Sequence, residues 1–182
     1  VPVEHADRLV IRMDPGSAFG TGSHPTTRLC LEALETAPPR GSLVADLGCG
    51  SGVLGLAALG LGARSVVAAD TDSLAVRATT DNRSLNRHDA AELEVAQGSV
   101  ETLQRLLAGR RADLLLCNIL APVIEALAPS FESLLAEEGR ALLSGLLVDQ
   151  APRLIQVLGD LGWMVTASAE QGRWGLLDIR RA

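Results

Sequence analysis

The stretch Val44-Ala45-Asp46-Leu47-Gly48-Cys49-Gly50-Ser51-Gly52-Val53 decides the fold of this 182-residue chain. An apolar run over Leu43–Leu47 is typical of a buried strand, three glycines follow within five positions, and small apolar residues then continue to Leu61 as in a helix. A strand, a glycine loop and a helix in this order let the backbone approach a ligand at a helix N-terminus. Because Val53 stands where a dinucleotide fingerprint has its third glycine, the loop favours a nucleoside ligand without a diphosphate. A glycine turn that binds no ligand is the alternative.

From residue 43 onward the pattern alternates between strands and helices. Nearly continuous apolar strands such as Leu114-Leu115-Leu116 predict an α/β fold, a doubly wound and mostly parallel sheet covered on both faces. Two strands close together at the C-terminus predict an antiparallel hairpin at its edge. The predicted strands are Arg8–Arg12, Leu43–Leu47, Ser65–Ala69, Leu93–Ala96, Asp113–Cys117, Arg140–Ser144, Trp163–Ala169 and Trp174–Arg180. The predicted helices are Thr26–Glu35, Val53–Leu61, Ser73–Asn86, Val100–Ala108, Pro122–Leu135 and Gln150–Leu158.

Composition limits the classes of function. The hydrophobic share of 47% is that of a globular protein, and 182 residues suffice for one well-buried domain but are few for two. With two Phe, two Trp and no Tyr, a sheet that stacks bases on aromatic rings is not expected. The net charge of −6 argues mildly against direct nucleic-acid binding and is compatible with a basic protein partner.

The cysteines indicate a reducing compartment. Cys30, Cys49 and Cys117 are far apart in the sequence and form no CxxC or Cys/His pair. We therefore expect reduced, buried thiols in a cytoplasmic protein, with no disulfide and no metal site. No run approaches the roughly eighteen apolar residues of a membrane span, and no signal peptide opens the chain, so no membrane partner is expected.

Acidic residues near two strand ends are candidates for binding a nucleoside. Asp70 ends the second strand of the alternating region, where its carboxylate can accept both hydroxyls of a ribose. We prefer Asp70 to Asp72, because Asp72 and Ser73 look like the N-cap pair of the next helix. Asp46, two residues before the glycine loop, could face a ligand's ammonium group. A role as a helix or loop cap is the alternative for Asp46, and both can hold.

A third signal is the turn Cys117-Asn118-Ile119-Leu120-Ala121-Pro122 after the fourth strand of the alternating region. The Asn118 side-chain carbonyl could accept hydrogen bonds from an incoming amine and so aim its lone pair; an ordinary Asn turn is the alternative. No residue is an obvious general base. His24 is the only histidine near a proposed site, and a cap or loop role is favoured for it. Phe19 could pack over the ligand or the incoming side chain, or could seal the domain as a plug.

Three segments together resemble one family. Asp14-Pro-Gly-Ser-Ala-Phe-Gly-Thr-Gly-Ser-His-Pro-Thr-Thr27, Asp46-Leu-Gly-Cys-Gly-Ser-Gly52 and Asn118-Ile-Leu-Ala121 are similar to motifs of the bacterial ribosomal protein L-eleven methyltransferase family. The resemblance extends over essentially the whole chain, including Ser144-Gly145-Leu146-Leu147. The glycine loop alone would indicate only an S-adenosylmethionine-dependent methyltransferase. The long loop together with the Asn turn is specific to far fewer families.

The resemblance implies the seven-stranded class I methyltransferase sheet with S-adenosyl-L-methionine as cofactor. It also implies methylation of amino groups, lysine side chains and the N-terminal amine, on large-subunit ribosomal protein eleven. Asn118 would then orient the acceptor amine. The cofactor contacts implied by matching position are Thr27, Gly48, Asp70 and Asn118, with Phe19, Thr21, Asp46 and Gly50 as further candidates.

The resemblance also implies a small N-terminal domain that recognises the ribosomal protein, and we expect residues 1–182 to be a catalytic-domain fragment without it. A stand-alone relative, whose substrate the family does not give, is the alternative. We expect residues 1–182 to form a single methyltransferase domain, with a strand, a cofactor-covering loop and a helix in 1–41 and the core sheet in 42–182. Such a catalytic domain is expected to bind the cofactor and to transfer weakly. A methyltransferase acting on another protein, a small molecule or a nucleic-acid amine would share the cofactor site. A nicotinamide-dependent oxidoreductase is disfavoured, because the third glycine and a catalytic Tyr or Lys are missing.

Overall fold

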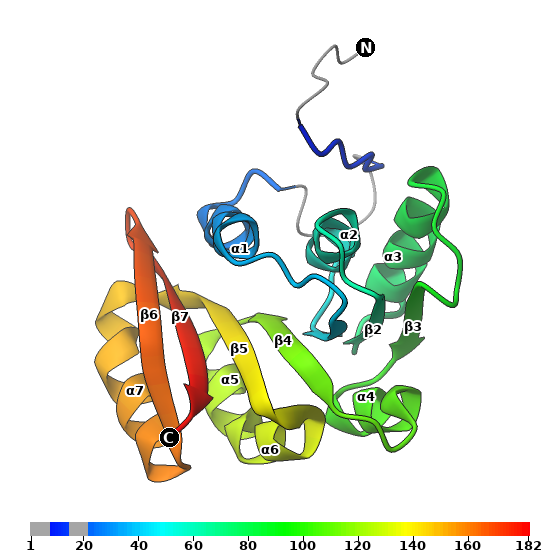
Figure 1. Ribbon diagram of the computed structural model, residues 1–182. Helices are drawn as coiled ribbons and strands as arrows, with labels where there is room; N and C mark the ends of the chain where they lie inside the picture. The colour runs from blue at the N-terminus through cyan, green and yellow to red at the C-terminus, as the bar shows by residue number, and fades with distance from the viewer. Residues whose placement is uncertain (1–7, 15–21) are drawn as a thin grey trace.

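A seven-stranded sheet separates two layers of helices in the computed structural model, which describes residues 8–14 and 22–182 (Figure 1). The spatial order is β3-β2-β1-β4-β5-β7-β6. The first five strands in this order are parallel, and β7 runs antiparallel to both β5 and β6. The predicted doubly wound sheet with an antiparallel C-terminal strand is therefore confirmed. The strands are β1 (Leu43–Leu47), β2 (Ser65–Asp70), β3 (Leu93–Gln97), β4 (Ala112–Asn118), β5 (Leu135–Leu147), β6 (Trp163–Gln171) and β7 (Trp174–Arg181).

The helices lie on both faces of this sheet. One layer packs on the face to which Val44 of β1 points, and the other on the face to which Leu43, Ala45 and Leu47 point. The first layer contains α1 (Pro25–Thr36), α2 (Val53–Gly60) and α3 (Ser73–Leu85). The second contains α4 (Val100–Leu107), α5 (Ala121–Leu127), the 3₁₀ helix η1 (Ala128–Ser130), α6 (Phe131–Leu134) and α7 (Ala151–Asp160), which follows the 3₁₀ helix η2 (Val148–Gln150). No helix in the described part of the chain is long and apolar enough to cross a membrane.

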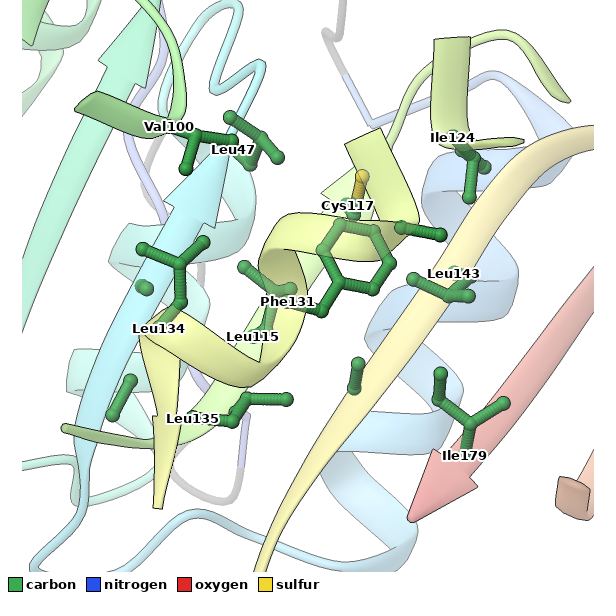
Figure 2. Close-up of a cluster of buried hydrophobic side chains, with 14 of the residues drawn as sticks. Leu47, Val100, Leu115, Cys117, Ile124, Phe131, Leu134, Leu135, Leu143 and Ile179 are labelled. Carbon is green, nitrogen blue, oxygen red and sulfur yellow. The ribbon is translucent and has the colours of Figure 1, made fainter. Parts of the chain in front are cut away.

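The larger core fills the space between the sheet and the second helix layer. Figure 2 shows the ring of Phe131 near Cys117 of β4 and Leu143 of β5, and Phe131 is completely buried. Burial of a side chain of this size stabilises the fold by about 2–3 kcal/mol. Because almost no aromatic residues are available, the rest of this core is built mainly from Leu and Ala, with some Val and Ile.

The three cysteines are free and buried, as predicted. Desolvation by burial raises the pKa of Cys30 to about 12 and raises the pKa values of Cys49 and Cys117 as well. These thiols are therefore protonated and unreactive at neutral pH. Among the described residues, no group of three or more His, Cys, Asp or Glu side chains could hold a metal ion.

The strand expected over Arg8–Arg12 is wrong. Residues 8–14 form neither strand nor helix, and side chains of α3 and of its C-cap residue bond to their backbone instead. The Asn86 side chain accepts from Arg12 N–H (2.8 Å) and donates to Arg12 C=O (2.7 Å), and Asn82 accepts from Asp14 N–H (2.8 Å). The side-chain amide of Asn86 thus takes the place of a neighbouring strand, and the residue types of this segment cannot reveal such a distant partner.

The helix expected over Pro122–Leu135 is interrupted. The chain forms α5, a 3₁₀ turn at Ala128–Ser130 and the short α6, and then enters β5 at Leu135. Pro129 lies in the 3₁₀ turn and has no N–H to donate to the preceding helical turn, which explains the break. The break turns Phe131 and Leu134 into the core.

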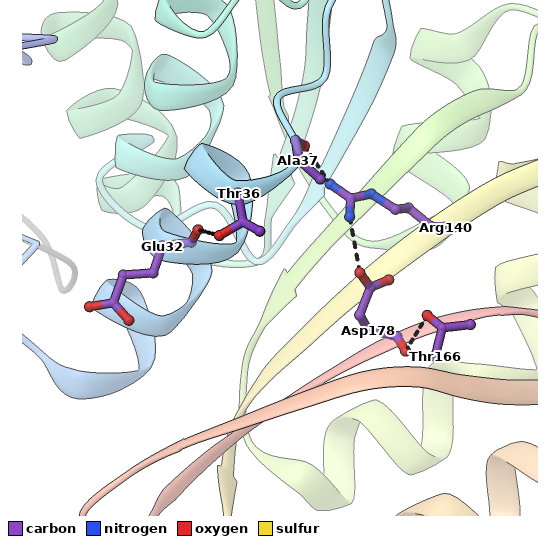
Figure 3. Close-up of polar contacts among 6 residues, drawn as sticks. All are labelled: Glu32, Thr36, Ala37, Arg140, Thr166 and Asp178. Carbon is purple, nitrogen blue, oxygen red and sulfur yellow. Dashed lines mark hydrogen bonds and ion pairs between the residues drawn. The ribbon is translucent and has the colours of Figure 1, made fainter.

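An ion pair anchors the end of α1 to the antiparallel part of the sheet (Figure 3). The Arg140 guanidinium on β5 bonds Asp178 of β7 at 2.9 Å and donates to the carbonyl oxygen of Ala37 at 2.8 Å. Burial raises the pKa of Asp178 even though the guanidinium groups of Arg140 and Arg180 lower it. Because Ala37 caps the C-terminus of α1, this contact helps to hold the opposite end of α1 over the carboxyl ends of the parallel strands.

Candidate active site

A cavity of about 600 Å³ opens at the carboxyl ends of β1, β2 and β4. The chain crosses to β2 on one side of β1 and reaches β4 on its other side, so the cavity lies at the topological switch point where α/β sheets bind ligands. Its volume is in the range of small-molecule and cofactor sites. Its walls come from the glycine loop (Leu47, Gly48, Gly50), the ends of β2 and β3 (Asp70, Thr71, Gly98, Ser99), the turn after β4 and α5 (Asn118, Ile119, Leu120, Val123, Leu127), and His24, Thr26, Gly145 and Trp174.

The glycine loop has a backbone that L side chains rarely adopt. Gly48, Gly50 and Gly52 have φ values of +75°, +54° and +80°. The Gly48 N–H donates to the carbonyl of Ala69 at 2.8 Å, which ties the loop to the end of β2. Only glycine takes these angles without strain, so the spacing read from the sequence corresponds to a true left-handed turn at the cavity wall.

Helix α3 supports this loop from behind, and the sequence analysis missed that support. The Thr79 hydroxyl donates to Gly50 C=O at 3.0 Å, and the Asn82 side chain donates to Ser51 C=O at 2.9 Å. Both residues are almost completely buried. A Cβ on Gly52 would lie 2.8 Å from Thr79 Cγ2, so α3 can pack this closely only against a glycine. Two polar residues three apart in one predicted helix were the available signal.

Asp70 lies at the end of β2 on the cavity wall, as predicted. One carboxylate oxygen accepts from Gly50 N–H at 2.9 Å and the other accepts from Asp72 N–H at 3.0 Å. Each oxygen keeps a lone pair for a ligand hydroxyl. Asp72 is the N-cap of α3 and accepts from Leu74 N–H at 2.8 Å, so the preference for Asp70 over Asp72 agrees with the geometry.

Asp46 lies beneath the loop, away from the cavity wall. It is 1% exposed and points to the helix layer that contains α2, where a Cβ on Gly55 would lie 3.4 Å from Oδ2. Burial raises the pKa of Asp46 to about 7, the Gly55 backbone amide lowers it and the charge of Asp70 raises it. Oδ2 has no hydrogen-bonding partner among the described residues. The structure therefore does not place the Asp46 carboxyl at the cavity, where it was expected to face a ligand's ammonium group.

The buried carboxyl of Asp46 predicts pH-dependent stability. The native state keeps the proton up to about pH 7 whereas the unfolded chain releases it near pH 4, so stability falls as pH rises through this window, by about 4 kcal/mol in all. Asp46→Asn removes the titration. Urea unfolding at pH 5 and pH 8 gives the free energy of unfolding of both proteins. The variant's value relative to that of the native protein should be about 3 kcal/mol higher at pH 8 than at pH 5. The same stability difference at both values would contradict a raised pKa.

Asn118 ends β4 and lies on the cavity wall, as predicted. Its Nδ2 donates to the Thr27 hydroxyl on α1 at 3.4 Å. Because Nδ2 is turned toward Thr27, Oδ1 is the amide atom left to accept from a ligand donor. Thr27 itself is 1% exposed and lies outside the cavity lining, so in this geometry it reaches the cavity through Asn118.

His24 is the N-cap of α1 and also lines the cavity. Its Nδ1 accepts from Thr26 N–H at 3.3 Å and lies 2.8 Å from the Thr26 hydroxyl. Because a backbone N–H can only donate, Nδ1 carries no proton and the neutral ring carries it on Nε2. The cap role favoured by the sequence is thus confirmed, and neither ring nitrogen of this tautomer is placed to take a proton from a ligand.

Trp174 completes the end of the cavity opposite Asp70, and the sequence analysis did not single it out. It is the first residue of β7, and its ring meets His24 edge-on with centroids 4.9 Å apart and planes at 68°. Its rarity was the one signal that could have marked it as a candidate, since the sequence has only two tryptophans. The candidates Phe19 and Thr21 lie outside the described residues, as do residues 15–21 of the long loop.

The antiparallel β7 between β5 and β6 and the cavity at the end of β1 define a class I methyltransferase fold, whose cofactor is S-adenosylmethionine. The residues present fit that cofactor, since a carboxylate at the end of β2 faces a wall of glycines that lack Cβ atoms. The family model for ribosomal protein L11 methyltransferase (PrmA) matches residues 1–182, and the chain belongs to that family.

Relatives and solved structures agree with this assignment. The chain is 82% identical over 181 residues to the ribosomal protein L11 methyltransferase of Parasynechococcus marenigrum (strain WH8102) and 67% identical to that of Prochlorococcus marinus (strain MIT 9303). All of this chain is covered, with 63% and 60% of those proteins, so it spans about three fifths of the length of the curated relatives it matches. The crystal structure of ribosomal protein L11 methylase from Lactobacillus delbrueckii subsp. bulgaricus has a TM-score of 0.87 at 34% identity, over 100% of this chain and 90% of that one.

Proposed function

We propose that this chain binds S-adenosyl-L-methionine in the cavity and methylates amino groups of ribosomal protein L11, at lysine side chains and the N-terminal amine, in the cytoplasm. The observation that carries the proposal is that one cavity brings together Gly48, Asp70 and Asn118, three positions at which the family implies cofactor contacts. Membership of the family over residues 1–182 supports the choice of substrate.

The polar end of the cavity suits the nucleoside. Asp70 is fixed by the N–H groups of Gly50 and Asp72, so its remaining lone pairs are held in place for the two ribose hydroxyls. Gly48 and Gly50 leave their backbone open at the wall. When bound, S-adenosyl-L-methionine supplies an electrophilic methyl group on a cationic sulfonium.

The apolar side of the cavity suits the acceptor amine. At pH 7 a lysine amine in water is neutral in only about one molecule in two thousand, so deprotonation costs about 4–5 kcal/mol. Withdrawal from water favours the neutral, nucleophilic form. The side chains that would exclude water here are Ile119, Leu120, Val123 and Leu127.

Asn118 provides the orientation. With Nδ2 engaged by Thr27, its Oδ1 accepts an N–H of the neutral amine and so aims the amine lone pair. We assign no base role to His24, because its Nδ1 already accepts from Thr26. The amine proton is then lost to solvent before transfer, and the chain contributes mainly desolvation and positioning.

Two measurements test cofactor and substrate separately. S-adenosyl-L-methionine at a hundred times its Kd should raise the Tm by about 5–10 °C, whereas NAD should leave it unchanged. Ribosomal protein L11 incubated with the chain and the cofactor should gain mass in whole methyl units. A Tm shift with NAD alone would overturn the cofactor, and transfer to RNA with none to the protein would overturn the substrate.

A further inference from the structure

Ile119, the residue after Asn118, is enclosed by two glycines from different parts of the chain. A Cβ on Gly48 would lie within 3.0 Å of Ile119 Cγ2. A Cβ on Gly145 would lie 2.6 Å from the carbonyl carbon of Ile119 and 2.9 Å from its nitrogen. The side chain of Ile119 therefore packs on the glycine loop, and its backbone packs on β5.

Gly145 lies at an irregularity of β5 that leaves room for this approach. The pairing of β5 with β7 shifts register between Ser144 and Leu146, and Gly145 has a φ of +84°. The preceding residue, Ser144, is the register partner of Asn118 in β4. A bulge that re-aims the chain beside a functional site is a common use of this feature.

Gly48, Ile119 and Gly145 all line the cavity beside Asn118. The peptide bond between Asn118 and Ile119 sets the direction in which the Asn118 side chain leaves the backbone. A shift of Ile119 therefore moves Asn118 relative to the glycine loop. A displacement of about 1 Å is enough to cost on the order of 100-fold in rate.

We propose that Ile119 is a positioning residue that sets Asn118 against the glycine loop, and that Gly145 acts by leaving space for the Ile119 backbone. The proposal rests on the proposed function of Asn118 in orienting the amine. It predicts that a methyl group on Gly145 reduces transfer far more than cofactor affinity, because the Asn118 turn moves while Asp70 keeps its bonds to the loop.

The test compares two glycines with nearly the same left-handed φ. Gly109 has a φ of +82° and nothing within 4 Å of a Cβ, so Gly109→Ala introduces left-handed strain without a clash. Gly145→Ala introduces similar strain together with the clash. We expect Gly145→Ala to lower kcat about 100-fold with cofactor Kd within about threefold. Gly109→Ala should lower Tm without changing kcat.

A direct readout of Asn118 needs no activity. The chain has three asparagines, Asn82, Asn86 and Asn118, so ¹⁵N-asparagine labelling gives three side-chain amide signals. In Gly145→Ala the Asn118 signal should move while the other two stay. An unmoved Asn118 signal, or equal movement in Gly109→Ala, would overturn the proposal. If no acceptor is methylated by the native chain, the function of the site fails but this readout still decides the positioning role.

A second pair of variants covers the case in which Gly145→Ala does not fold. Ile119→Ala removes the Cγ2 that faces Gly48, whereas Ile119→Val keeps both γ carbons. We expect Ile119→Ala to lower kcat about tenfold and to shift the Asn118 signal, with both restored in Ile119→Val. Equal behaviour of the two variants would show that Cγ2 does not position the turn and would contradict the proposal.

Discussion

Asp70→Ala is expected to lower the affinity for S-adenosyl-L-methionine on the order of 100-fold. The side chain would lose two charge-assisted hydrogen bonds to ribose, together worth about 3 kcal/mol. The substitution also removes the acceptor of Gly50 N–H at 2.9 Å, so the glycine loop loses part of its support. Isothermal titration calorimetry measures this loss directly.

Asp72→Ala is the matched control for that substitution. Asp72 carries the same charge two residues along the chain but caps α3 through Leu74 N–H. Its loss should cost about 1 kcal/mol of stability and leave cofactor affinity nearly unchanged. Unchanged affinity in Asp70→Ala, or equal losses in both variants, would remove Asp70 from the site.

Asn118→Ala is expected to lower kcat about 100-fold or more and to change cofactor affinity much less. The amide oxygen that accepts from the amine disappears, so the lone pair is no longer aimed at the methyl group. Transfer to ribosomal protein L11 from labelled cofactor gives kcat, and calorimetry gives the affinity. Equal losses in the two quantities would contradict an orienting role for Asn118.

Ser144→Ala controls for a general loosening of the strand ends. Ser144 pairs with Asn118 in the register of β4 and β5, and its buried hydroxyl donates to the Gly175 carbonyl at 2.9 Å. We expect this variant to lose about 1 kcal/mol of stability with kcat unchanged. A kcat as low as that of Asn118→Ala would indicate that packing at the strand ends, and not the amide, supports transfer.

The central part of the sheet could be predicted because its signals are local. The apolar run Leu43–Leu47 and the glycines that follow lie within one short window, and the structure reproduces their order. The choice of Asp70 over Asp72 as the candidate ligand residue also rested on local signals. Asp72 was recognised as an N-cap from the helical residues that follow it. Asn118 was predicted to lie near Asp70 because both residues end parallel strands. The carboxyl ends of parallel strands meet at one edge of the sheet.

Three features could not be predicted, because each depends on a partner distant in sequence. Residues 8–12 hold a short apolar run that resembles a strand, but the backbone of Arg12 pairs with the Asn86 side chain. Asp46 precedes the loop as a ligand-binding carboxylate could, but the strand alternation turns it under α2. Trp174 joins the cavity only because β7 inserts between β5 and β6.

Residue order within short windows was therefore enough to establish the strand, the glycine turn, the position of Asp70 at the end of its strand and the family to which the chain belongs. Tertiary packing alone decided that Asp46 is buried with a raised pKa, that Thr27 contacts Asn118 from outside the cavity lining, and that Gly48 and Gly145 enclose Ile119. The physical reason is the distance along the sequence over which each property is determined. Backbone conformation and capping depend on neighbouring residues, whereas burial, pKa and side-chain position depend on which distant segments the sheet brings together.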